Sequence, residues 1–280
     1  MRIKKHANGN QYLLTPQSKW VRNFAKSGVP NIDINKTIKS EDHFLLLQNE
    51  FNNSLNRYAW IDSEKYYHPN VVIVSDGFDF EEKHKIIDSL PSNIIFIGVN
   101  GSLKKWQAKR NMSYYVVNNP YNECMKYLPR SNKLLPKCIA SSRTNSNFLK
   151  NYNGTRFKYY PVNEQEYKGM SSKEVMWQID DYRNSICAAI GLSYRFGAEK
   201  VLLLCCDNVF KDERAGASQL ENKLWIYPQQ NIVHGLIDAN LYWFSNQEYY
   251  TTKAGDCSSG PLYDYAAYIE LDKILNFFES

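Results

Sequence analysis

The sequence DDYRNSICAAIGLSYRFGAEKVLLLCCD, residues 180–207, predicts a helix, a turn and a buried strand in immediate succession. Apolar residues recur at steps of three and four as far as Phe196, which indicates a helix with one buried face, and Gly197 ends it. Residues 201–204 are apolar on both faces of any strand they form, as in a parallel strand that helices cover on both sides. Asp207 follows at the carboxyl end of that strand, where ligands bind in open α/β sheets. The alternative is that Asp207 only caps the next turn.

Short apolar runs alternate with helical patterns along most of the chain, and together they predict the fold class. Alternation of this kind indicates a parallel sheet with right-handed crossovers. We therefore expect an α/β fold over residues 71–280, a Rossmann-like and mostly parallel sheet flanked by helices, with an N-terminal extension over residues 1–70. Further strands are expected at 71–74, 94–97, 114–117, 138–140, 157–162 and 249–252, and further helices at 40–58, 81–90, 103–110, 234–244 and 262–278.

The composition restricts the possible partners and compartment. The chain has 280 residues, of which 43% are hydrophobic and 22% charged, with a formal net charge of +5. This charge is too diffuse to indicate a nucleic-acid partner. We find no apolar leader and no run of 18 apolar residues, so no membrane partner is expected. The six cysteines include no CxxC spacing, which favours reduced, buried thiols in a cytoplasmic protein over disulfides or a zinc site.

Small polar residues follow the predicted strands and form the candidate nucleotide site. The carboxyl ends of parallel strands meet at one edge, so amide, hydroxyl and backbone N–H groups would gather there. Such groups suit the base, ribose and phosphates of a small-molecule nucleotide. The sequence lacks the GxGxxG, GxxxxGK[ST] and GxSxG motifs, so dinucleotide oxidoreductases, P-loop kinases and α/β-hydrolases are disfavoured. The candidate residues are Ser75, Asp76, Gly77, Asn100, Asn119 and Ser141.

Four further residues carry groups that a transferase needs. Carboxylates bind hard cations, so Asp207 and Asp181 are candidate Mg²⁺ ligands, although Asp181 could instead supply charge at a helix N-terminus. Arg183 is the best-placed phosphate ligand, because a guanidinium holds two oxygens at once. His234 could act as a general base on an acceptor hydroxyl, or it could be a surface or packing histidine.

The segments 71–77, 94–100, 115–120 and 185–207 together resemble the MptE-like family, typified by 6-hydroxymethyl-dihydropterin diphosphokinase. They also resemble its relatives, the bacterial CMP-sialyltransferases and the motility-associated flagellin glycosyltransferases. The resemblance covers about residues 70–250 and is strongest in AAIGLSYRFGAEKVLLLCCD, residues 188–207. It implies that Asn100 and Asn119 hold the nucleotide, that Ser185 contacts it, and that His234 lies near the catalytic base. Ser75 to Asp79 stand where the family has a Gly-x-Gly-Pro-Ser loop.

Three hypotheses follow from the residues and the resemblance. In the first, Mg²⁺ and ATP supply a diphosphoryl group to a hydroxymethyl-pterin-like acceptor, with Asp207 and Asp181 on the metal and Arg183 on the phosphates. The alternative is a glycosyltransferase that uses a CMP- or UDP-linked sugar, with His234 as the base. The third is a non-catalytic nucleotide-binding module.

Overall fold

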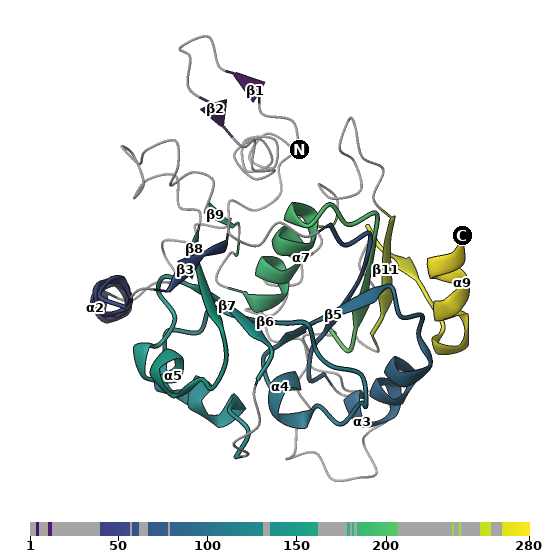
Figure 1. Ribbon diagram of the computed structural model, residues 1–280, viewed down its shortest axis with the longest axis horizontal. Coiled ribbons are helices and arrows are strands. Elements are labelled where there is room, and N and C mark those ends of the chain that lie inside the picture. Colours follow the sequence, from purple (N-terminus) through teal and green to yellow (C-terminus); the bar gives the residue numbers. More distant parts are fainter. Residues whose placement is uncertain are drawn as a thin grey trace.

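The computed structural model describes residues 4–5, 11–12, 40–56, 58–61, 67–77, 79–130, 135–161, 178–179, 181, 184–206, 237, 241, 253–258 and 265–280. Within these residues, the main sheet has ten strands (Figure 1), and every pair of neighbours in it is parallel. Their order is β12-β11-β10-β4-β5-β6-β7-β8-β3, with β9 also pairing with β8. The bounds are β3 Ala59–Trp60, β4 Asn70–Val74, β5 Ile94–Val99, β6 Tyr114–Val117, β7 Lys137–Ser141, β8 Arg156–Pro161, β9 Gln178–Ile179, β10 Lys200–Leu204, β11 Lys253–Cys257 and β12 Ala267–Tyr268.

The order of the strands confirms the predicted Rossmann-like α/β fold. From β4 the chain adds β5, β6, β7 and β8 in one direction, whereas β10, β11 and β12 extend the sheet in the other. The order therefore reverses between β4 and β10, and in open α/β sheets ligands bind outside the carboxyl ends of the strands at such a point. A separate antiparallel pair joins β1 (Lys4–Lys5) and β2 (Gln11–Tyr12).

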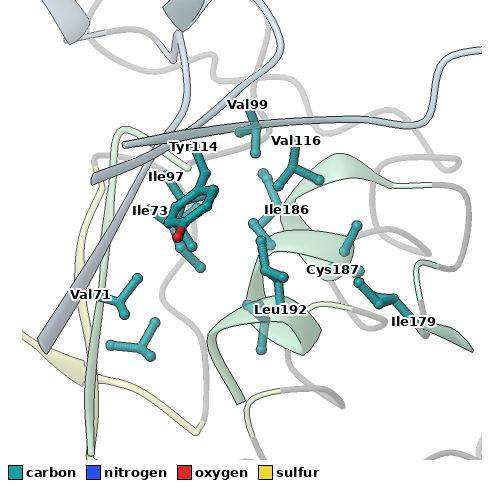
Figure 2. Packing of buried hydrophobic residues seen from close by; sticks show 14 of the residues in the cluster. Val71, Ile73, Ile97, Val99, Tyr114, Val116, Ile179, Ile186, Cys187 and Leu192 are labelled. Atoms are coloured by element: carbon teal, nitrogen blue, oxygen red, sulfur yellow. The ribbon is translucent and has the colours of Figure 1, made fainter. Parts of the chain in front are cut away.

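Helix α7 (Ser185–Arg195) covers one face of the sheet over β4, β5 and β6. The side chain of Asn184 begins the helix by accepting hydrogen bonds from the amides of Ile186 and Cys187. Gly197 follows the helix with φ +71, a conformation that side-chain-bearing residues rarely adopt. Figure 2 shows the resulting core, in which α7 packs against alternate residues of the three strands. Those strand residues are Val71, Ile73, Ile97, Val99, Tyr114 and Val116.

Shorter helices cover the opposite face of the sheet (Figure 1). Over β4, β5 and β10 lie α3 (Phe80–Lys83), the 3-10 helix η3 (His84–Ser89) and the C-terminal α9 (Ile274–Glu279). Over β6 and β7 lie α4 (Ser102–Lys105), η4 (Asn122–Tyr127) and α5 (Ser146–Asn151). None of the helices in the described ranges is long and apolar enough to cross a membrane.

For two of the predicted helices, tertiary contacts explain why the observed extent differs from the predicted one. The helix expected at 103–110 is only α4, because the amides of Gln107 and Ala108 donate to Nε2 of His84 instead of continuing the helix. The helix expected at 262–278 is replaced in its described part by β12, the 3-10 helix η6 (Leu271–Lys273) and α9. There the amide of Ile269 donates to the carbonyl of Asp256 in β11, so this segment extends the sheet.

Two elements before residue 70 pack with the main sheet. Strand β3 pairs with β8 at the end of the sheet, and α2 (Ser40–Ser54) lies beside it (Figure 1). The helix predicted at 40–58 is shorter than predicted, because it ends at Ser54. The predicted strand at 249–252 and most of the predicted helix at 234–244 lie outside the described residues, although Ile237 and Leu241 are helical and fully buried.

Candidate functional site

The carboxyl ends of β4 and β10 are held together by their backbones. The amides of Ser75 and Gly77 donate to the carbonyls of Leu204 and Cys205 at 3.1 Å each. Cys205 has φ +57, an uncommon conformation for a residue other than glycine. Residues in such conformations cluster at functional sites. The chain therefore leaves β10 in an uncommon backbone conformation at the point where the strand order reverses.

A hydrogen-bonded turn at the end of β11 supports the end of β10. The amide of Cys206 donates to Oγ of Ser258 at 2.9 Å, and the amide of Ser258 donates to Oδ1 of Asp256 at 3.0 Å. Asp256 is only 1% exposed. This chain of contacts holds the residue immediately before Asp207. The sequence pattern did not identify Asp256 or Ser258, because the predicted strand ended before both.

Asp76 and Gly101 bring the ends of β4 and β5 into close contact. A Cβ atom at position 101 would lie 2.1 Å from Oδ2 of Asp76, so only glycine leaves room for this carboxylate. Asn100, with φ +53, precedes the glycine, and its side-chain Nδ2 donates to Oγ of Ser75 at 3.3 Å. The buried Tyr115 hydroxyl donates to the carbonyl of Asn100 at 2.8 Å. Burial raises the pKa of Tyr115, so its hydroxyl stays protonated and keeps this donor role.

Asn118, at the end of β6, meets the first residue of α7. Its Oδ1 accepts a hydrogen bond from the hydroxyl of Ser185 at 2.9 Å, and both side chains are buried. Asn118 is 8% exposed, and its Nδ2 has no hydrogen-bond partner among the described residues. A buried donor without a partner is costly, on the order of 1–3 kcal/mol, and calls for an explanation. Asn118 thus presents a donor at the N-terminus of an 11-residue helix.

Asp181 lies further along the edge, against β8. Its Oδ2 accepts a hydrogen bond from the buried hydroxyl of Tyr159 at 2.8 Å, and Asp181 is 3% exposed. Burial raises the pKa of Tyr159, with Asp181 adding to the effect, which keeps the tyrosine protonated as the donor.

Ser141, at the end of β7, accepts from the amide of Arg143 at 3.3 Å, and Arg143 forms an ion pair with Glu50 at 3.2 Å.

The structure brings together four of the predicted nucleotide-binding residues, Ser75, Asp76, Gly77 and Asn100, at the ends of β4 and β5. Ser185 lies at the end of β6, but the asparagine in contact with it is Asn118 rather than Asn119. The side chain of Asn119 instead accepts from the amide of Tyr121, within its own turn. Strand alternation could have identified Asn118, because residues 114 and 116 face α7 and 118 continues that series.

The predicted catalytic residues Asp207, Arg183 and His234 lie outside the described residues. The predicted pairing of Asp207 with Asp181 on a metal therefore stays a prediction. Among the described residues, no group of three or more His, Cys, Asp or Glu side chains could hold a metal ion. All six cysteines are buried, as predicted.

Comparisons with known proteins support the fold. No family model and no curated protein matches the chain. Among solved structures, the chain is similar to the MAf glycosyltransferase from Magnetospirillum magneticum AMB-1, with a TM-score of 0.57 and 12% sequence identity. The similarity covers 82% of this chain but only 39% of the glycosyltransferase. At this identity the comparison shows a shared Rossmann-like α/β architecture.

Proposed function

We propose that this chain is a glycosyltransferase that binds a nucleotide-sugar donor at the carboxyl edge of the sheet. The observation that carries the proposal is the unpartnered Nδ2 of Asn118, buried beside Ser185 at the start of α7. A nucleotide offers many acceptor oxygens, so a ligand oxygen would satisfy this donor. The partial positive charge at the N-terminus of α7 also favours an anionic ligand there.

The charges at the strand ends favour a nucleotide-sugar over ATP. The carboxylate of Asp76 lies against Gly101 where β4 and β5 end, so a triphosphate placed there would meet a like charge. Asn100, Ser75 and Ser185 are neutral donors and acceptors, which suit the hydroxyls and the base of a nucleoside. The one structural neighbour described above is a glycosyltransferase, which agrees with this choice.

In the proposed reaction, an acceptor hydroxyl attacks the anomeric carbon of the sugar as its bond to the nucleotide phosphate breaks. His234 takes the hydroxyl proton, and Arg183 neutralises the charge of the departing phosphate. Asp207, which follows β10 in the sequence, positions the donor or holds a divalent cation together with Asp181. The role of His234 rests on the resemblance to the sialyltransferases, and the roles of Arg183, Asp207 and Asp181 rest on residue chemistry.

The test is a calorimetric binding panel of CMP, UDP, GDP and ATP, each with and without Mg²⁺, followed by detection of released nucleotide from the matching sugar donor. We expect CMP or UDP to bind and its sugar conjugate to be turned over. Binding of ATP only with Mg²⁺ would instead support diphosphoryl transfer to a pterin-like acceptor. Tight binding without turnover would support a non-catalytic module, and a panel without any binding would contradict a nucleotide site.

A further inference from the structure

The hydrogen bond between Ser185 and Asn118 determines which groups of the pair remain for a ligand. The hydroxyl of Ser185 donates to Oδ1 of Asn118 at 2.9 Å, so its only proton is used and its oxygen can still accept. The Nδ2 of Asn118 has no hydrogen-bond partner among the described residues, so it can still donate. The pair therefore offers one donor and one acceptor to a ligand.

A single hydroxyl group satisfies both of them. A hydroxyl accepts and donates at the same time, whereas a phosphate oxygen only accepts. Between Nδ2 and the serine oxygen, a ligand hydroxyl closes a ring in which the amide, the serine and the ligand each donate and accept one hydrogen bond. The bonds of such a chain strengthen one another. A phosphate oxygen would satisfy Nδ2 but would turn its lone pairs toward those of the Ser185 oxygen.

The surroundings of the pair also favour a hydroxyl over the other parts of a nucleotide. Asn118 and Ser185 are 8% and 5% exposed, so a small group reaches them more readily than a heterocyclic base. The amides of Ile186 and Cys187 already donate to Oδ1 of Asn184, which leaves fewer helix-terminal amides for a phosphate. The charge at the N-terminus of α7 still favours an anionic nucleotide, whose phosphate then lies beside the pair rather than on it.

We propose that the Asn118–Ser185 pair holds one ribose hydroxyl of the nucleotide-sugar donor. This inference rests on the proposed function and narrows it to donors that carry the hydroxyl. The 2′- and 3′-hydroxyls have the same chemistry, and deoxy analogues distinguish them. If the group is the 2′-hydroxyl, the donor is a sugar linked to a ribonucleotide, and sugars linked to deoxythymidine diphosphate are excluded.

Calorimetric titration of the full chain with deoxy analogues tests the proposal. CMP, UDP and GDP are each compared with their 2′-deoxy and 3′-deoxy forms. For the nucleotide that binds, we expect one of the two forms to bind at least about tenfold more weakly, because it leaves the buried Nδ2 without a partner. The other form should bind within about threefold of the nucleotide itself.

Ser185→Ala tests whether the pair causes this preference. The variant removes the acceptor, so the preference for the hydroxyl should shrink at least about threefold. Ser193→Ala is the matched control, because Ser193 is a buried serine of the same helix whose hydroxyl donates to the carbonyl of Ala189 at 2.8 Å. The control should keep the full preference.

The possible failures are distinguishable. Equal affinity for the nucleotide and both deoxy forms would overturn the proposal but leave the nucleotide site intact, with water on the pair. A preference that Ser185→Ala leaves unchanged would also overturn it, because the hydroxyl would then be held elsewhere. If CMP, UDP and GDP all fail to bind, the proposed function is overturned, and this inference with it.

Discussion

Two polar groups border strands of the main sheet, the hydrogen bonds around Arg110 and the Asn118–Ser185 pair, and their hydrogen bonding differs. The guanidinium of Arg110 donates to the carbonyls of Leu90, Pro91 and Ile94 at 2.8 to 2.9 Å, and lies 4.6 Å from the ring of Phe96. The acceptors are all from the protein, so this cluster is structural. The Asn118–Ser185 pair instead leaves one buried donor unused. Unlike the Arg110 cluster, the Asn118–Ser185 pair therefore keeps a donor that a ligand oxygen would satisfy.

The largest expected effect comes from Arg110→Ala. It removes the donors for several backbone carbonyls and the stacked contact with Phe96, so we expect a loss of about 3 kcal/mol in the free energy of unfolding. Urea denaturation measures it. Arg110→Lys should recover only part of the loss, because an ammonium cannot match the planar fork. Full stability in Arg110→Lys would show that the charge, rather than the planar geometry of the guanidinium, stabilises the segment that carries the acceptor carbonyls.

Asn118→Asp tests the other member of the comparison. The substitution keeps an oxygen to accept from Ser185 but replaces the unpartnered donor with a negative charge. We expect nucleotide affinity to fall about a hundredfold, or roughly 3 kcal/mol, and the free energy of unfolding to fall by roughly 1–3 kcal/mol because the new carboxylate is buried. Calorimetric titration with the nucleotide identified by the panel measures it.

Asn119→Asp is the matched control, because it makes the same change in the neighbouring residue, whose side chain accepts from Tyr121. It should leave nucleotide affinity within about threefold of the parent chain, a difference of less than about 1 kcal/mol. Equal losses in both variants would mean that charge at this edge, rather than the Nδ2 donor, governs binding. Unchanged nucleotide affinity in Asn118→Asp would make Asn118 structural, like Arg110.

The residues that could be predicted are those whose environment is set along the chain itself. β4, β5, β6 and α7 follow from local apolar patterns, which is why the sheet and its carboxyl edge were predictable. The amides of Gln107 and Ala108 bond to His84, more than twenty residues away, instead of continuing the predicted helix. A local sequence pattern cannot predict such a contact. Asn118 and Asn119 follow β6 on opposite sides of its alternation, and the alternation rule can tell them apart.

Gly101→Ala should have a smaller effect, and only through Asp76. Gly101 has φ −73, which alanine adopts readily, so the cost arises from the 2.1 Å approach of the new Cβ to the carboxylate. We expect a loss of about 1–2 kcal/mol by chemical denaturation. In an Asp76→Ala background the same substitution should be neutral or slightly stabilising. An equal loss in both backgrounds would place the clash elsewhere.

The smallest effect, and the only one that depends on pH, concerns His84. Its Nε2 accepts from two backbone amides at 3.2 Å each, which requires the neutral imidazole, and burial lowers its pKa below 6.5, against the opposing influence of Asp88 and Glu81. Below pH 6.5 His84 binds a proton in the unfolded chain but stays neutral in the folded chain. The free energy of unfolding therefore falls as the pH falls toward the folded-state pKa. One such group contributes at most about 1.4 kcal/mol per pH unit.

His84→Gln tests this origin, because a glutamine oxygen can accept from the same amides without titrating. The variant should lose part of the pH dependence of its urea midpoint between about pH 6.5 and 5.5, while its stability near neutral pH changes little. An unchanged pH slope would assign the dependence to another of the five histidines. It would also mean that the amides of Gln107 and Ala108 do not require a neutral imidazole. In that case the contacts around Arg110, rather than those of His84, would explain why the predicted helix at 103–110 ends early.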